Sequence, residues 1–135
     1  MKETTQNNPF EFIIYVADQV CSRNFYATVL NSQPLLDVPG MTEFELSAGC
    51  KLGIMPENGI ARILQNRLPH PASGNGIPRC ELYMLSADAP GLMNRLNEAG
   101  ATLVSPMADR DWGHSVAYYA DPDGHIIAVA REQVR

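Results

Sequence analysis

The most constraining feature of this sequence is an internal repeat at a fixed offset of 70 residues. Glu11 corresponds to Glu81, and Asp18 corresponds to Asp88. An apolar run follows each glutamate and passes directly into a helical pattern. One repeat of this size in a chain of 135 residues indicates a single duplication rather than a solenoid array. A duplicated fold places equivalent residues of both copies around a shared centre, so a site there should draw on both halves.

The first half predicts a β-α-β-β-β unit. Residues 11–16 form a short, nearly continuous apolar run, which is typical of a strand covered on both faces. Asp18 is a good N-cap for the helix that follows. That helix has an apolar stripe at helical spacing, formed by Ser22, Phe25, Tyr26, Val29 and Leu30. Three further strands are expected at 35–36, 41–48 and 50–55.

The second half repeats this plan after a connecting segment at 56–78. Prolines and glycines in that segment disfavour regular structure, although a short helical piece at 60–64 is compatible with it. A strand at 80–85 and a helix that starts after Asp88 and ends at Gly100 are expected. Later strands are expected at 101–104, 115–120 and 125–130. The offset grows to 75 near the end, which places about five additional residues in a loop at 107–114.

The composition is that of a compact protein with one ordinary core, read as a single domain over 1–135. The chain is 45% hydrophobic and 19% charged, and no apolar run approaches the ~20 residues of a membrane span. We expect no membrane association and a cytoplasmic location. Three cysteines without CxxC spacing predict neither a disulfide framework nor a zinc knuckle. The net charge of −5 argues against nucleic acid as a partner.

Several short motifs, taken in this order on a duplicated chain, resemble the vicinal-oxygen-chelate superfamily, which contains glyoxalase I, the extradiol dioxygenases and the bleomycin-resistance proteins. The motifs are Val16-Ala17-Asp18, the helix at 25–30, Asn97-Glu98-Ala99-Gly100, and Trp112-Gly113 leading to the turn at 119–125. The resemblance implies an α+β fold. It implies two βαβββ modules, at about 10–55 and 79–131, whose mixed sheets curl into a cup.

Metal-dependent members of that superfamily place four ligands in the cup, two from each module, around one divalent ion. The first position of each module falls on Glu11 and Glu81. The second positions fall on Gly53 and Ala128, which have no ligating side chain. We therefore expect no complete metal site and no cofactor. If a nickel, zinc, manganese or iron ion were bound, it would depend on Glu11 and Glu81 with one histidine.

Other candidate ligand-binding residues lie in the second half. Trp112 and His114 belong to the expanded loop, where Trp112 is either an aromatic wall for a ligand or hairpin packing. Alternation along a strand sends either Tyr118 or its neighbour toward the cup. His125 is expected to stabilise its own turn, and His70, which is flanked by prolines, is expected to be a solvated loop residue.

Two classes of function remain open. The first is a small-molecule-binding protein similar to bleomycin-resistance proteins, which sequesters an antibiotic or another small ligand in a cleft of a homodimer. The alternative is a glyoxalase- or dioxygenase-like enzyme (a lyase, isomerase or oxidoreductase) with an atypical metal site at Glu11 and Glu81, or a metal-free one that uses both as acid and base. We expect these carboxylates to approach each other, which would raise one pKa. Otherwise they are solvated starts of edge strands.

Overall fold

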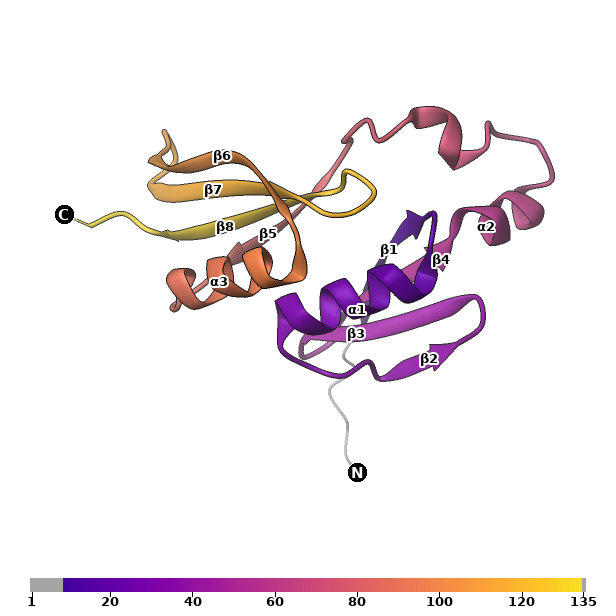
Figure 1. The fold of residues 1–135 in the computed structure, drawn as a ribbon, viewed down its shortest axis with the longest axis horizontal. Helices are drawn as coiled ribbons and strands as arrows, with labels where there is room; N and C mark the ends of the chain where they lie inside the picture. Colours follow the sequence, from indigo (N-terminus) through magenta and orange to yellow (C-terminus); the bar gives the residue numbers. More distant parts are fainter. Residues whose placement is uncertain (1–8, 135) are drawn as a thin grey trace, which may run out of the picture.

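The sequence repeat corresponds to two four-stranded mixed sheets in the computed structural model, which describes residues 9–134 (Figure 1). The sheet orders are β1-β4-β3-β2 and β5-β8-β7-β6. In each sheet the first strand is parallel to the last, and the other pairs are antiparallel. The strands are β1 (Phe10–Val16), β2 (Leu36–Val38), β3 (Met41–Ser47), β4 (Cys50–Pro56), β5 (Glu81–Leu85), β6 (Thr102–Asp109), β7 (His114–Ala120) and β8 (Ile126–Glu132). The predicted α+β architecture of two βαβββ modules is confirmed.

One helix packs on each sheet. Both helices begin where the sequence predicts, and α3 also ends where it predicts. In α1 (Gln19–Leu30), Asp18 Oδ1 accepts a hydrogen bond of 3.0 Å from the amide of Cys21. In α3 (Ala89–Ala99), Asp88 Oδ1 accepts one of 3.1 Å from the amide of Gly91. The α3 helix ends at Gly100, whose positive φ of 88° is a backbone conformation that glycine adopts without steric cost.

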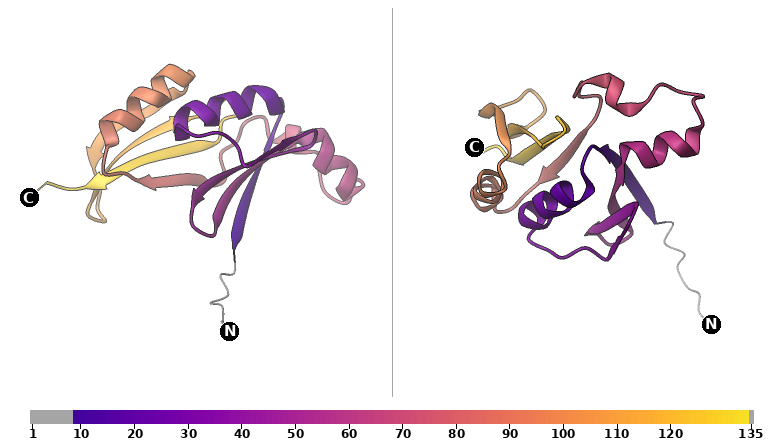
Figure 2. Two further views of the ribbon diagram at one scale, coloured as in Figure 1. Left: turned by 90° about the horizontal axis from the view of Figure 1, so that it is seen from below. Right: turned by 45° about the vertical axis from the view of Figure 1, so that its right-hand side comes forward.

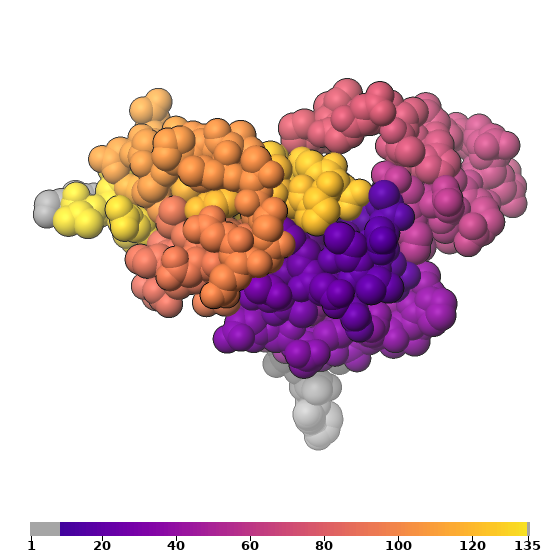
Figure 3. All heavy atoms as spheres, viewed as in Figure 1, coloured from indigo at the N-terminus to yellow at the C-terminus, as the bar shows by residue number. Residues whose placement is uncertain are grey.

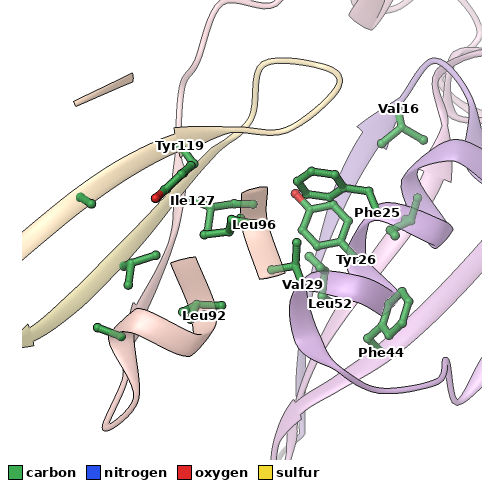
Figure 4. Close-up of a cluster of buried hydrophobic side chains, with 14 residues drawn as sticks. Val16, Phe25, Tyr26, Val29, Phe44, Leu52, Leu92, Leu96, Tyr119 and Ile127 are labelled. Carbon is green, nitrogen blue, oxygen red and sulfur yellow. The ribbon is translucent and has the colours of Figure 1, made fainter. Parts of the chain in front are cut away.

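The main hydrophobic core contains residues of both modules. The helices α1 and α3 contact each other and lie on the same side of the two sheets (Figure 2). Their apolar stripes therefore converge with residues from both sheets in one cluster (Figure 4). Its largest fully buried side chains are Tyr26, Tyr119, Phe44, Ile54, Leu96 and Ile127.

Polar contacts from the β7–β8 turn fasten the second module to the first. The phenol of Tyr26 donates a 2.7 Å hydrogen bond to Asp121 Oδ2, and both side chains are buried. The amide of Ala17 donates to Asp123 Oδ1 at 2.9 Å. His125 Nε2 lies 2.9 Å from the carbonyl of Tyr15, so this histidine bridges the modules as well as closing its own turn.

The connection between the modules contains more regular structure than the sequence predicts. It includes α2 (Glu57–Leu64) and the short 3-10 helix η1 (Pro71–Gly74), and it arches away from the rest of the molecule (Figure 3). His70 is not merely solvated, because its Nδ1 accepts from the amide of Ala72 at 3.0 Å and caps η1. No helix within residues 9–134 has the length and apolar character to cross a bilayer.

The expected loop at 107–114 is shorter than predicted. β6 continues to Asp109, because its last residues pair with the start of β7. The connecting turn therefore occupies only 110–113. Two register shifts, on either side of Ser105, absorb the additional residues within the strand. This places Trp112 and His114 at one end of the second sheet, beside each other.

Candidate functional site

Each sheet has one face packed against a helix and one face turned away from it, which we call the open face (Figure 2). Side chains alternate along a strand, and Phe44 and Leu52 of the first sheet are buried against the core. Their neighbours in sequence therefore lie on the open face of that sheet. The open face of the first sheet carries Glu11, Ile13, Tyr15, Glu43, Lys51 and Gly53. The open face of the second sheet carries Tyr83, His114, Val116, Tyr118, Ala128, Ala130 and Glu132.

A carboxylate cluster occupies the first open face. The backbone register places Glu11 beside Lys51, and Glu43 beside Gly53. Lys51 Nζ lies 3.3 Å from Glu43 Oε1, which forms a half-exposed ion pair. The Oε2 atom of Glu11 is buried and has no hydrogen-bond partner within residues 9–134. Glu11 is therefore not a simple solvated strand start.

The pKa of Glu11 is raised above its ordinary value. Burial is the largest cause, followed by a hydrogen bond to Glu43 and by the negative charge of Glu43, while Lys51 acts in the opposite direction. Two carboxyl groups form a hydrogen bond only when one of them holds a proton. The raised pKa therefore favours the protonated form of Glu11 in the folded protein.

Gly53 explains how Glu11 fits into this place. A Cβ atom at residue 53 would collide with Glu11 Oε2 and would lie 2.8 Å from Ile13 Cγ1. The position that the superfamily resemblance assigns to a second metal ligand is therefore filled by the carboxyl group of Glu11. Within residues 9–134, no three potential His, Cys, Asp or Glu ligands gather in one place. Because Gly53 and Ala128 have no ligating side chain, the described residues do not form a complete set of metal ligands within one chain.

An aromatic–histidine cluster, formed by Tyr83, Trp112, His114 and Glu132, lies on the second open face. The hydroxyl oxygen of Tyr83 lies 2.6 Å from His114 Nδ1 and accepts a 2.9 Å hydrogen bond from Trp112 Nε1. On the other side of the imidazole, Nε2 lies 3.6 Å from a carboxylate oxygen of Glu132. The structure thus brings together the predicted Trp112 and His114. It adds Tyr83 and Glu132, which the sequence reasoning missed.

Tyr118 lies on the same open face, whereas Tyr119 is buried in the core, as alternation requires. The ring of Tyr118 packs against a floor of Val116, Ala128 and Ala130. The guanidinium of Arg110 sits 5.2 Å from the centre of that ring. Its Nη2 donates to neutral oxygens, including the carbonyl of Val116 at 2.9 Å.

Glu81 does not join the carboxylate cluster. It is exposed at the start of β5, and no hydrogen bond or ion pair links it to Glu11 in the described part of the chain. The carboxylate neighbour of Glu11 is instead Glu43, because the missing side chain of Gly53 leaves room between β1 and β3. Alternation along β3, which places Glu43 on the same face as residue 53, is the signal that could have found this pair.

A cavity of about 920 Å³ lies between the two modules, beside the edge strands β1 and β5. Its walls are mainly apolar and come from both strands and from α1 and α3, including Phe12, Ile14, Val29, Leu82, Met84 and Leu92. Tyr83 and Glu81 also line it. Tyr83 therefore connects the cavity with the aromatic–histidine cluster.

Comparisons with known proteins agree with this architecture. The model of the glyoxalase-like domain family matches residues 10–133. An uncharacterised protein of Mycobacterium bovis is 25% identical over 83% of this chain and 75% of its own length. A glyoxalase-related enzyme from Fulvimarina pelagi has a TM-score of 0.76 at 22% identity, covering 90% of this chain and 86% of that one.

A second solved structure is described as a glyoxalase/bleomycin resistance protein/dioxygenase family enzyme from Burkholderia phytofirmans. It has a TM-score of 0.75 at 14% identity and covers 96% of this chain and all of its own. At this level of identity the two solved structures support the fold alone, whereas the family model spans nearly every described residue. The chain belongs to the glyoxalase-like domain family, within the vicinal-oxygen-chelate superfamily.

Proposed function

We propose that this protein binds a small organic molecule without a complete metal site, at a place formed by the inter-module cavity and the second open face. The observation that carries the proposal is the junction at Tyr83, where a mainly apolar cavity of about 920 Å³ meets hydrogen-bonding and aromatic groups. Ligand sites in proteins are typically concave and apolar, with a few fixed polar groups. Sequestration of an antibiotic or a similar molecule is one use of such a site.

The proposed binding unit is a homodimer. The outer edges of β1 and β5 have no strand partner within residues 9–134. Phe10 and Phe12 on β1 are 69% and 74% exposed. Exposed, apolar strand edges are normally covered in native proteins, and a second copy of the chain is the occupant that we propose. It would also close the open faces, which one chain leaves uncovered.

A ligand screen by thermal unfolding tests the binding proposal. A ligand at 100 times its dissociation constant should stabilise the protein by about 2.7 kcal/mol. Trp112→Ala should reduce the shift, because the indole borders the proposed site. Ile63→Ala, which truncates an exposed apolar residue on α2, is the matched control. If no compound shifts unfolding, or if Trp112→Ala and Ile63→Ala respond alike, the proposed location is wrong.

Light scattering at micromolar concentration tests the assembly. We expect the mass of a dimer, and a shift toward monomer in Phe12→Lys. Val20→Lys places the same charge on a similarly exposed apolar position of α1 and should leave the mass unchanged. A monomeric wild-type protein would contradict the homodimer.

The second candidate function is a glyoxalase- or dioxygenase-like enzyme with an atypical metal site. It is favoured by the equivalent positions of Glu11 and Glu81 in the two sheets and by the place of Glu81 in the cavity wall. Metal analysis after incubation with nickel, zinc, manganese or iron decides between the two functions. Stoichiometric metal that is lost in both Glu11→Gln and Glu81→Gln would favour the enzyme.

A further inference from the structure

The hydrogen bonds of the aromatic–histidine cluster determine where its protons lie. An indole N–H can only donate, so the oxygen of Tyr83 accepts from Trp112. Glu132, 3.6 Å from Nε2 of His114, favours a proton on that nitrogen. In the neutral ring Nδ1 is then an acceptor, and the hydroxyl proton of Tyr83 points to it over 2.6 Å. This tautomer is assigned from the electrostatic contact with Glu132, which at 3.6 Å is longer than a hydrogen bond.

This arrangement leaves one acceptor position on the oxygen of Tyr83. A phenol oxygen donates one hydrogen bond and accepts up to two, and Trp112 and His114 take one of each. Tyr83 is 37% exposed and lines the inter-module cavity. A ligand that reaches Tyr83 from the cavity is therefore met by a hydrogen-bond acceptor, and a donor group on the ligand is the complement.

We propose that Tyr83, His114 and Glu132 form a proton-accepting site for the weakly acidic hydroxyl group of a phenol. The ligand O–H bond breaks as a new O–H bond forms on Tyr83. The original Tyr83 proton moves to Nδ1 of His114, and the ligand remains as a phenolate that accepts a hydrogen bond from Tyr83. The site gains the positive charge that the ligand loses, so no external acid, base or oxidant is needed.

The groups around the site suit both products of this transfer. Glu132 faces Nε2 of the imidazolium, in the way that a carboxylate orients and stabilises a histidine in nucleophile–histidine–carboxylate triads. Trp112, which is largely exposed, and Tyr118 provide aromatic surface for a phenol ring. Arg110 adds a positive charge over Tyr118 on the same face, and the partners of its Nη2 are neutral oxygens.

This inference rests on the proposed ligand-binding function and narrows its ligand class. The probe is 4-nitrophenol, whose phenolate has its own long-wavelength absorption band. The assay is run slightly above neutral pH, where an ordinary imidazole is mostly neutral, and the free probe at the same pH is the reference. We expect additional phenolate absorption, here called the phenolate band, to appear on binding to the wild-type protein. Tyr83→Phe and His114→Gln should abolish this band and weaken binding of the probe about tenfold, the size of one lost charge-assisted hydrogen bond.

Two controls separate a proton-accepting role from a structural one. Tyr15→Phe removes a hydroxyl from the open face of the first sheet and should leave the phenolate band unchanged. 4-Nitroanisole has the same ring but no acidic proton, and its binding should change less than about twofold in Tyr83→Phe, because no proton transfer is lost. A phenolate band that persists in Tyr83→Phe and His114→Gln would overturn the inference.

The remaining outcomes distinguish this inference from the proposed function. If 4-nitroanisole binds as well as 4-nitrophenol and no phenolate band forms, the binding site is right and the proton transfer is wrong. If neither compound binds, a phenol is not the ligand class and the inference fails. The broader ligand screen then decides whether the protein binds small molecules at all.

Discussion

The contact between Tyr26 and Asp121 should be the strongest single polar clamp between the modules. Tyr26 donates over 2.7 Å to a carboxylate that is only 6% exposed. The other carboxylate oxygen of Asp121, Oδ1, accepts hydrogen bonds from the amides of Asp123 and His125. These bonds hold the carboxylate in place, so it cannot rotate to find another donor for Oδ2. Tyr26→Phe leaves Oδ2 buried without its partner. A hydrogen bond to a charged group contributes about 1.5–3 kcal/mol, which is the expected loss of unfolding free energy.

Chemical denaturation of Tyr26→Phe and Tyr119→Phe measures this contribution. Tyr119 is equally buried, at 2% exposure, but no hydrogen bond of its hydroxyl is found within residues 9–134. Removal of the Tyr119 hydroxyl should lower the free energy of unfolding by less than about 0.5 kcal/mol. In thermal unfolding, the difference between the variants should be on the order of 5–10 °C. Equal losses in the two variants would refute the clamp, because the same atom is removed from both.

Alkaline pH provides an independent check on the same contact. Burial, followed by the charge and hydrogen bond of Asp121, holds the pKa of Tyr26 well above its ordinary value. The folded state therefore favours the protonated phenol. Its contribution is complete below about pH 10 and is lost as the pH rises further. The stability difference between wild type and Tyr26→Phe should narrow above that pH.

Three further predictions concern the first module. Gly53→Ala should lower the free energy of unfolding, measured by chemical denaturation, by about 1–3 kcal/mol, because the new Cβ collides with Glu11 and Ile13. The loss should be smaller when Glu11 is also replaced by alanine. Glu11→Gln should stabilise the protein at neutral pH. The raised pKa of Glu11 means that the folded state favours the protonated carboxyl group, so the stability of the wild type falls as the pH rises above about 4.5. The variant should lack this fall. Asp18→Ala should lower stability by about 1 kcal/mol, measured by denaturation against the exposed-surface control Val20→Ala, because it removes the cap on α1.

Local patterns in the sequence were sufficient for most of the fold. Asp18, Asp88 and Gly100 act through neighbours within four residues, so their roles as helix caps could be predicted from short motifs. The duplication then predicted the same order of elements, β-α-β-β-β, along both halves of the chain. The extension of β6 to Asp109 was missed because it depends on pairing with β7 and on two register shifts, which leave no periodic signal.

The candidate site was only partly predictable, because its contacts join distant parts of the chain. Trp112 and His114 were predicted from their place in the enlarged loop. Tyr83, which touches both, lies 29 and 31 residues away in the sequence, and nothing local indicates the contact. The proximity of Glu11 and Glu43 was missed for a related reason. Alternation along β3 gives the face on which Glu43 lies, but the contact also depends on β4 lying between β1 and β3 and on the space at Gly53.

The small residues at 53 and 128 explain why the two halves of the duplication differ in chemistry. Gly53 lies beside Ile13, and Ala128 lies beside Tyr83, at equivalent places in the two sheets. In the first sheet the vacant space holds a carboxyl group, and in the second it adjoins a tyrosine bound to histidine and tryptophan. If a second copy brings the two kinds of open face together, as proposed, one cleft would combine the carboxyl groups of Glu11 and Glu43 with the tyrosine–histidine pair of the second sheet. The small residues at 53 and 128 would then leave room for side chains of different chemistry on the two walls of that cleft.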